Sequence, residues 1–238
     1  MKTIGLLGGM SWESTAEYYR IANELIRDRL GGFHSAKILL DSVDFAEIEE
    51  LQRTDRWDAA GTVLADHAAA LQAAGAEIIV LCTNTMHVVA DQIEAALSVP
   101  FLHIADATAA AVKGADITRV ALLGTGFTMR MPFLSDRLAS QGLDVRVPDE
   151  SDIETVHRII YRELVHGVVA DQSRARCRAV IDRLVAGGAE GIILGCTEIE
   201  LLITDADSPV PVFPTTRIHV TAAIDAALDQ AAAEISTP

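Results

Sequence analysis

Two short stretches of this chain place a thiol or a hydroxyl directly after an apolar run. The first, EIIVLCTNTMH, contains Cys82 and Thr83 side by side, and the second, EGIILGCTEIE, contains Cys196. A free thiol has a pKa of about 8.5, and the N-terminus of a helix lowers it. A thiol that stands between a strand and a helix is therefore expected to act as a thiolate base.

The two stretches also align with each other, which decides which residues correspond. GAEIIVLCT and GAEGIILGC match at an offset of 113 residues, and two flanking matches follow the same order at offsets of 116 (IGLLGGM with VALLGTG) and 111 (VPF with VPV). The gapless alignment pairs Thr83 with Cys196, and it pairs Cys82 with Gly195. Cys82 is thus expected to be a buried strand residue, as free cysteines often are.

A pair of proton-transfer groups on opposite sides of a carbon acid is what inversion at Cα requires. One group removes the hydrogen while the other supplies a proton from behind, and nearby backbone N–H groups stabilise the enediolate that forms. If two related domains face each other, Thr83 and Cys196 lie on opposite walls of one cleft. A hydroxyl is a far weaker acid than a thiol, so the two walls are not equivalent.

The elements that position these residues alternate between short apolar runs and longer amphipathic ones, which predicts an α/β fold. Most strand candidates are continuously apolar, as in parallel sheets covered on both faces. The predicted strands are Thr3–Leu7, Ala36–Val43, Glu77–Leu81, Phe101–Ile104, Arg119–Leu123, Leu143–Val147, Gly191–Leu194 and Val210–Phe213. The predicted helices include Ser11–Leu30, one that begins at Asp44, Trp57–Ala74, Met86–Leu97, Ile199–Leu202, Ser173–Ala186 and Thr215–Ile235.

The repeat predicts two pseudo-symmetric α/β domains with mainly parallel sheets, flanked by helices, and an active site in the cleft between them. In open α/β sheets, ligands bind at the carboxyl ends of the strands. We expect residues 107–214 to form the second domain. Residues 1–106 and 215–238 form the first, because the last helix has no strand of its own and is expected to return to the first half.

Composition narrows the class of partner and the compartment. The chain has 238 residues and a net charge of −15, which disfavours nucleic acid and membrane surfaces as partners. The start, MKTIGLLGGM, predicts a strand and a glycine turn rather than a signal peptide. Three scattered cysteines favour a reducing compartment, so a cytoplasmic protein is expected. No His/Cys/Asp cluster has metal-ligand spacing.

Three motifs, GLLGGMSWEST, CTNTMH and GCTEI, resemble those of the cofactor-independent aspartate/glutamate racemase superfamily, above all its L-aspartate/glutamate-specific branch. The usual first motif is Cys-Asn-Thr, and Thr83 stands here in place of that cysteine. The second motif is present around Cys196. The resemblance covers essentially the whole chain. It implies PLP-independent racemisation of aspartate or glutamate with no cofactor, a Thr83/Cys196 catalytic pair, a preference for the L-enantiomer, and a homodimer.

The resemblance also suggests which side chains bind the substrate. It implies that Gln52 and Met10 line the pocket for the side-chain carboxylate. As a hypothesis, the α-carboxylate is held by Asn84, Thr85, Thr125 and Thr197. Glu198 follows Cys196 so closely that a role in the site is favoured over a helix-dipole role. Contacts of His87, His166, Arg53 and Arg56 with substrate stay open.

Other functions are compatible with parts of the pattern. One fold and one cysteine serve several chemistries. Malonate decarboxylation needs only the Cys196 side, whereas maleate isomerisation normally uses two cysteines. A non-catalytic amino-acid-binding protein would bind a dicarboxylate without exchanging its Cα hydrogen. Cys177 is expected to pack inside a helix-lined core, because Val180, Ile181 and Leu184 follow it at helical spacing.

Overall fold

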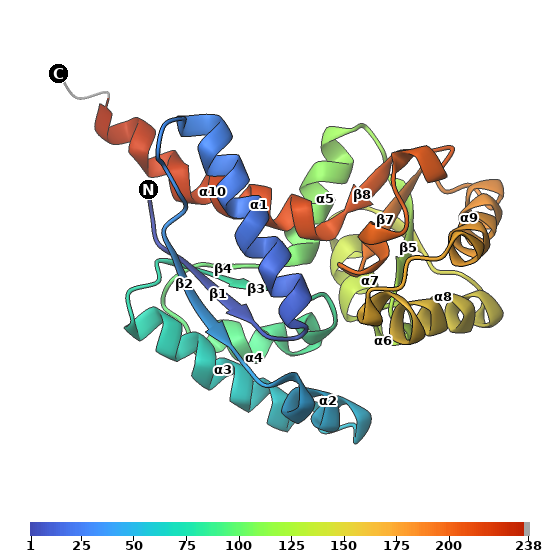
Figure 1. Cartoon of the computed structure of the whole chain (residues 1–238), viewed down its shortest axis with the longest axis horizontal. Helices are drawn as coiled ribbons and strands as arrows, with labels where there is room; N and C mark the ends of the chain where they lie inside the picture. The colour runs from blue at the N-terminus through green and yellow to red at the C-terminus, as the bar shows by residue number, and fades with distance from the viewer. Residues whose placement is uncertain (236–238) are drawn as a thin grey trace. The chain divides into compact units, whose positions relative to one another are not determined.

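The computed structural model describes residues 1–235, so the last three residues of the predicted first domain lie outside the described part (Figure 1). The chain divides into two compact units. Unit 1 contains Met1–His103 together with the chain from His219 onward, and unit 2 contains Ile104–Ile218. The chain therefore leaves unit 1 once and returns to it once.

Unit 1 is built on a four-stranded parallel sheet in the order β2-β1-β3-β4. Its strands are β1 (Ile4–Gly8), β2 (Ile38–Ser42), β3 (Ile78–Leu81) and β4 (Phe101–Leu102). Its helices are α1 (Trp12–Leu30), α2 (Phe45–Arg53), α3 (Trp57–Ala73), the 3₁₀ helix η1 (Thr85–Val89), α4 (Ala90–Ala95) and most of α10 (Thr215–Ile235).

Unit 2 repeats this plan with the sheet order β6-β5-β7-β8, again entirely parallel. Its strands are β5 (Arg119–Gly124), β6 (Asp144–Arg146), β7 (Gly191–Gly195) and β8 (Val212–Pro214). Its helices are α5 (Ile104–Gly114), α6 (Gly126–Arg130), α7 (Pro132–Ser140), α8 (Glu150–Arg162), α9 (Asp171–Ala186) and the 3₁₀ helices η2 (Leu164–His166), η3 (Ile199–Leu201) and η4 (Asp205–Asp207).

The predicted fold class is confirmed, and the internal repeat has a structural counterpart. In each unit, the second strand in sequence order lies at one edge of the sheet, and the third strand lies beside the first. The register repeats as well: Ile4 of β1 pairs with Ile78 of β3, and Val120 of β5 pairs with Gly191 of β7. All eight predicted strands are present, each with its bounds shifted by at most a few residues.

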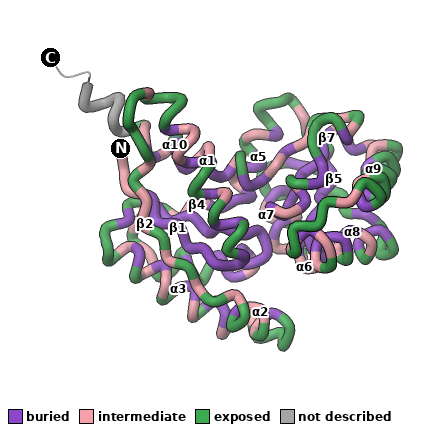
Figure 2. Tube along the Cα trace, viewed as in Figure 1, coloured by how far each residue is buried: buried purple, intermediate pink, exposed green. Residues whose placement is uncertain are grey.

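Each sheet is covered by helices on both faces, which explains why the central strands are continuously apolar. In unit 1, α1 and α10 pack on one face of the sheet, whereas α3, η1 and α4 pack on the other (Figure 1). In unit 2, α8 and α9 cover one face and α5 and α7 the other. Figure 2 shows the central strands as buried and the outer sides of the helices as exposed.

Local signals set the ends of the helix that follows the first strand. The Ser11 hydroxyl accepts a hydrogen bond from the Ser14 N–H and caps the start of α1. Gly31 ends the helix at φ 70°, a conformation that glycine adopts without steric cost. Across residues 1–235, the helices are each too short or too polar to cross a bilayer.

Candidate active site

In unit 1 the candidate site residues follow the buried strand β3. Thr83 and Asn84 lie between this strand and η1, Thr85 is the first residue of η1, and all three are buried. Cys82 is fully buried, as expected, but it follows β3 rather than lying in it, and burial raises the pKa of its thiol well above the usual value. Its backbone carbonyl accepts a hydrogen bond from the Ser14 hydroxyl at 3.0 Å, which ties the strand end to α1.

His87 is hydrogen-bonded to Thr83, the candidate catalytic residue. Its Nδ1 lies 2.8 Å from the backbone carbonyl oxygen of Thr83. The predicted helix over residues 86–97 is divided here into the 3₁₀ helix η1 and the short helix α4. His87 therefore lies on the first turn after Thr83 and is buried.

Met10 and Gln52, the predicted pocket residues of unit 1, are buried on the same side of the sheet. Met10 belongs to the core cluster that contains Ile48 and Met86. The Gln52 side-chain amide donates a hydrogen bond to the Met86 sulfur at 2.9 Å. A thioether is a weak acceptor, so a carboxylate oxygen would be a stronger partner for this N–H group. Arg53 and Arg56 are exposed, and Arg53 is ion-paired with Glu50.

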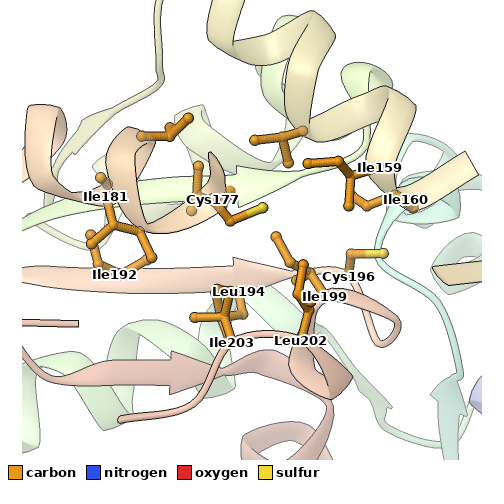
Figure 3. Close-up of a cluster of buried hydrophobic side chains, with 14 of the residues drawn as sticks. Ile159, Ile160, Cys177, Ile181, Ile192, Leu194, Cys196, Ile199, Leu202 and Ile203 are labelled. Carbon is orange, nitrogen blue, oxygen red and sulfur yellow. The ribbon is translucent and has the colours of Figure 1, made fainter. Parts of the chain in front are cut away.

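In unit 2 the candidate thiol follows β7. Cys196 is 5% exposed, and its Sγ donates a hydrogen bond to the Glu198 carboxylate at 2.9 Å. Figure 3 shows Cys196 beside Ile199 at the margin of a cluster of buried apolar side chains, and Cys177 deeper within that cluster. Cys177 is fully buried, as expected.

The expected lowering of the Cys196 pKa is wrong. Burial raises the pKa of the thiol well above its usual value, and the neighbouring Glu198 carboxylate raises it further. The backbone N–H groups of Ile199 and Glu198 act in the opposite direction but do not prevail. The helix predicted over residues 199–202 is a single 3₁₀ turn, which has few aligned peptide dipoles to stabilise a thiolate. In this structure Cys196 is a thiol whose S–H group is hydrogen-bonded to the Glu198 carboxylate.

Three threonines of unit 2 lie at strand ends. Thr125 follows β5 and caps α6 by accepting a hydrogen bond from the Thr128 N–H at 3.2 Å. Thr197, next to Cys196, has its hydroxyl 3.1 Å from that of Thr216. Thr216 was not predicted from sequence, although it lies just after β8, the strand that the VPF/VPV match identifies.

The predicted site residues thus fall into two groups. Met10, Gln52, Thr83, Asn84 and Thr85 belong to unit 1. Thr125, Cys196, Thr197 and Glu198 belong to unit 2, and so does the exposed His166.

His157 of unit 2 also escaped the sequence prediction. Its Nδ1 accepts a hydrogen bond from the Gly126 N–H at 3.1 Å and so supports the turn after Thr125.

Among residues 1–235, His, Cys, Asp and Glu side chains form no group suited to a metal ion.

Comparison with known proteins decides the family. The profile described as Asp/Glu/hydantoin racemase matches residues 7–223, which is most of the chain. The chain belongs to the Asp/Glu/hydantoin racemase family. The resemblance seen in its three motifs is confirmed, and the protein is an enzyme of the isomerase class, a racemase.

Two solved structures are similar in fold to this racemase over nearly its whole length. A Yersinia pestis protein, provisionally named an Asp/Glu racemase, is 54% identical, with a TM-score of 0.91 over 96% of this chain and 100% of that one. An aspartate racemase homologue from Pyrococcus horikoshii OT3 is 35% identical, with a TM-score of 0.85 over 95% of this chain and 99% of that one.

A more distant relative is the broad specificity amino-acid racemase RacX of Bacillus subtilis (strain 168). It is 24% identical over 155 residues, which cover 62% of this racemase and 63% of RacX.

Proposed function

We propose that this racemase interconverts the enantiomers of aspartate, glutamate or both without a cofactor, and that L-amino acids are its preferred substrates. Cys196 and Thr83 are the two proton-transfer groups. The observation that carries this proposal is the hydrogen bond from the Cys196 thiol to Glu198, because it gives the thiol an immediate proton acceptor. The internal repeat supplies Thr83 as the residue equivalent to Cys196.

The first half of the reaction uses the raised basicity of Cys196. Glu198 takes the S–H proton, and the thiolate then removes the Cα hydrogen of the L-substrate, which reforms the S–H bond and leaves an enediolate. A thiolate whose conjugate acid has a raised pKa is a stronger base towards a carbon acid than an ordinary thiolate. Glu198 lies within hydrogen-bond distance of the thiol, so its carboxylate can take the proton directly.

The second half adds a proton to the opposite face and gives the D-amino acid. The proton comes from the Thr83 hydroxyl or from a water bound to it. Solvent restores this proton, and Glu198 releases to solvent the proton that it took from Cys196. Because a hydroxyl is a weak acid, this step is expected to be the slow one. A single-thiol racemase should therefore deprotonate L-substrate more often than it completes inversion.

Substrate binding divides between the two groups of residues. We assign the α-carboxylate to Asn84, Thr85, Thr125 and Thr197, which lie at strand ends where backbone N–H groups favour anions. Gln52, with Met10 beside it, is assigned to the side-chain carboxylate, for which it would release the Met86 sulfur.

Exchange at Cα tests the assignment of the base. In D₂O, the wild-type enzyme should introduce deuterium into L-aspartate or L-glutamate, and Cys196→Ala should slow this about 10²- to 10⁴-fold, the usual range for loss of a general base. Cys82→Ala is the matched control, since it also removes a buried thiol but leaves exchange unchanged. Exchange by Cys196→Ala at the wild-type rate would refute the assignment.

Decarboxylation of a disubstituted malonate is a second candidate. This reaction needs a single thiol as proton donor, and with Thr83 in place of the first catalytic cysteine, Cys196 is that thiol. Incubation with aspartate, glutamate and an arylmalonate, followed by polarimetry and gas release, separates the two reactions. Release of carbon dioxide without inversion of either amino acid would favour the decarboxylase. Tight binding of a dicarboxylate without any Cα exchange would favour a non-catalytic binding protein.

Two broader proposals accompany this function. A thiol base must stay reduced, and all three cysteines are free thiols in this structure, so we place the enzyme in the cytoplasm. We propose a homodimer on the basis of the resemblance, and light scattering after size-exclusion chromatography measures the molar mass that decides it.

A further inference from the structure

The side chain of His87 holds the backbone of Thr83 in a defined orientation. A carbonyl oxygen can only accept a hydrogen bond, so the contact of 2.8 Å requires that His87 Nδ1 carries the proton. In the same turn, the His87 backbone N–H donates to the Asn84 carbonyl at 3.1 Å. One residue therefore binds two successive carbonyl groups, those of Thr83 and Asn84.

Fixing the Thr83 carbonyl also fixes the next N–H group. The peptide that joins Thr83 to Asn84 is planar, and in a trans peptide the C=O and N–H bonds point in opposite directions. When the carbonyl points at His87, the Asn84 N–H points away from it. The Thr83 Cα, which carries the hydroxyl, forms one end of this same plane.

The His87 ring is itself held by the rings of His103, which directly follows β4, and of His219 in α10. Its centroid lies 4.5 Å from that of His103 and 5.8 Å from that of His219. His219 is anchored at both nitrogens, with Nδ1 3.0 Å from the Tyr18 hydroxyl and Nε2 2.8 Å from the Leu102 carbonyl. His87, His103 and His219 are all buried, so the ring that holds Thr83 has little room to turn.

We propose that His87 is a positioning residue for the Thr83 side of the reaction: its Nδ1–H group orients the peptide after Thr83, and so sets how efficiently a proton reaches the face opposite Cys196. This inference rests on the proposed function, in which the Cys196 and Thr83 steps are separate. His87 acts through Thr83 and takes no proton from the substrate.

The test compares two amide variants that differ by one methylene group. In His87→Asn the amide nitrogen occupies the position of Nδ1 and can still donate to the Thr83 carbonyl, whereas in His87→Gln it lies one bond further out. For each enzyme, L-aspartate or L-glutamate is incubated in D₂O. The readout is the ratio of deuterium entering the recovered L-amino acid to D-amino acid formed. Both quantities in the ratio are produced by the same folded enzyme molecules, so partial misfolding of a variant does not change the ratio.

His87→Asn should keep a ratio close to that of the wild type. His87→Gln should raise it about three- to tenfold, because loss of one hydrogen bond slows only the second proton transfer. Equal ratios in all three enzymes, or an equal rise in both variants, would overturn the role of His87. Exchange that persists in Cys196→Ala would instead refute the proposed function, so the two failures are distinguishable.

Discussion

Acidification is expected to destabilise unit 1 through one buried histidine, His219. Burial lowers the pKa of this side chain from 6.5 to about 4. Its hydrogen bonds agree with a neutral ring, because Nε2 donates to the Leu102 carbonyl and Nδ1 accepts from the Tyr18 hydroxyl. In the unfolded chain the same residue gains a proton near its ordinary pKa of about 6.5.

The sign and size of the effect follow from these two pKa values. Between about pH 6.5 and about pH 4 the unfolded state binds a proton that the folded state does not, so stability falls as the pH falls. Each pKa unit corresponds to about 1.4 kcal/mol, which gives a loss of about 2 kcal/mol by pH of about 5 and about 3 kcal/mol below pH of about 4. Above about pH 7 the group contributes no pH dependence.

Urea unfolding at about pH 7.5 and about pH 5, followed by tryptophan fluorescence, measures this loss. Both tryptophans, Trp12 and Trp57, belong to unit 1 and so report on the unit that contains His219. The control is His219→Gln, which cannot titrate. Other groups, such as His157, whose pKa is lowered chiefly by burial, are present in both proteins and cancel in the comparison.

The free energy of unfolding of the wild type should fall by about 2 kcal/mol more than that of His219→Gln over this interval. Equal losses in the two proteins, within about 0.5 kcal/mol, would show that His219 is protonated in the folded protein, and the reasoning from its burial would fail.

Two further predictions concern unit 2. Glu198→Gln removes the acceptor for the Cys196 proton, so kcat should fall about 10²- to 10⁴-fold while the melting temperature stays near that of the wild type; an unchanged kcat would exclude Glu198 from the proton path. Gly124→Ala would place a Cβ atom 2.7 Å from the Gly195 carbonyl oxygen, at the junction of β5 and β7. Calorimetry should show a loss of about 1–3 kcal/mol from overpacking, and a variant as stable as the wild type would contradict the close approach of these strands.

The strands, though not their order in the sheets, were predictable from sequence because the cause is local. Continuously apolar runs such as Ile78–Leu81 are typical of strands covered on both faces, and the repeat makes Thr83 the counterpart of Cys196. The bounds of α10 were also predictable, from the apolar pattern that begins after β8.

Contacts between distant or crowded groups could not be predicted in the same way. The pKa of Cys196 depends on its burial and on the rotamer that brings Glu198 to 2.9 Å, and neither is visible in the letters GCTE. Tyr18 and His219 are 201 residues apart in the chain, and no local pattern connects them. The helix pattern after Thr83 indicated a helix but not its 3₁₀ start, which brings the His87 ring back to the Thr83 carbonyl.

The path of the chain through the two units has a consequence for biosynthesis. Unit 2 is one uninterrupted segment, whereas the core of unit 1 lacks Val220, Ile224 and Ala227 until α10 has been translated. At about 5–20 residues per second, the ribosome needs on the order of 10 s to translate the intervening segment. During this interval the face of the unit 1 sheet that α1 and α10 share has only α1 to cover it, while unit 2 can complete its core as soon as it emerges. The unit that contains Cys196 is therefore expected to fold before the one that contains Thr83, although Thr83 is synthesised first.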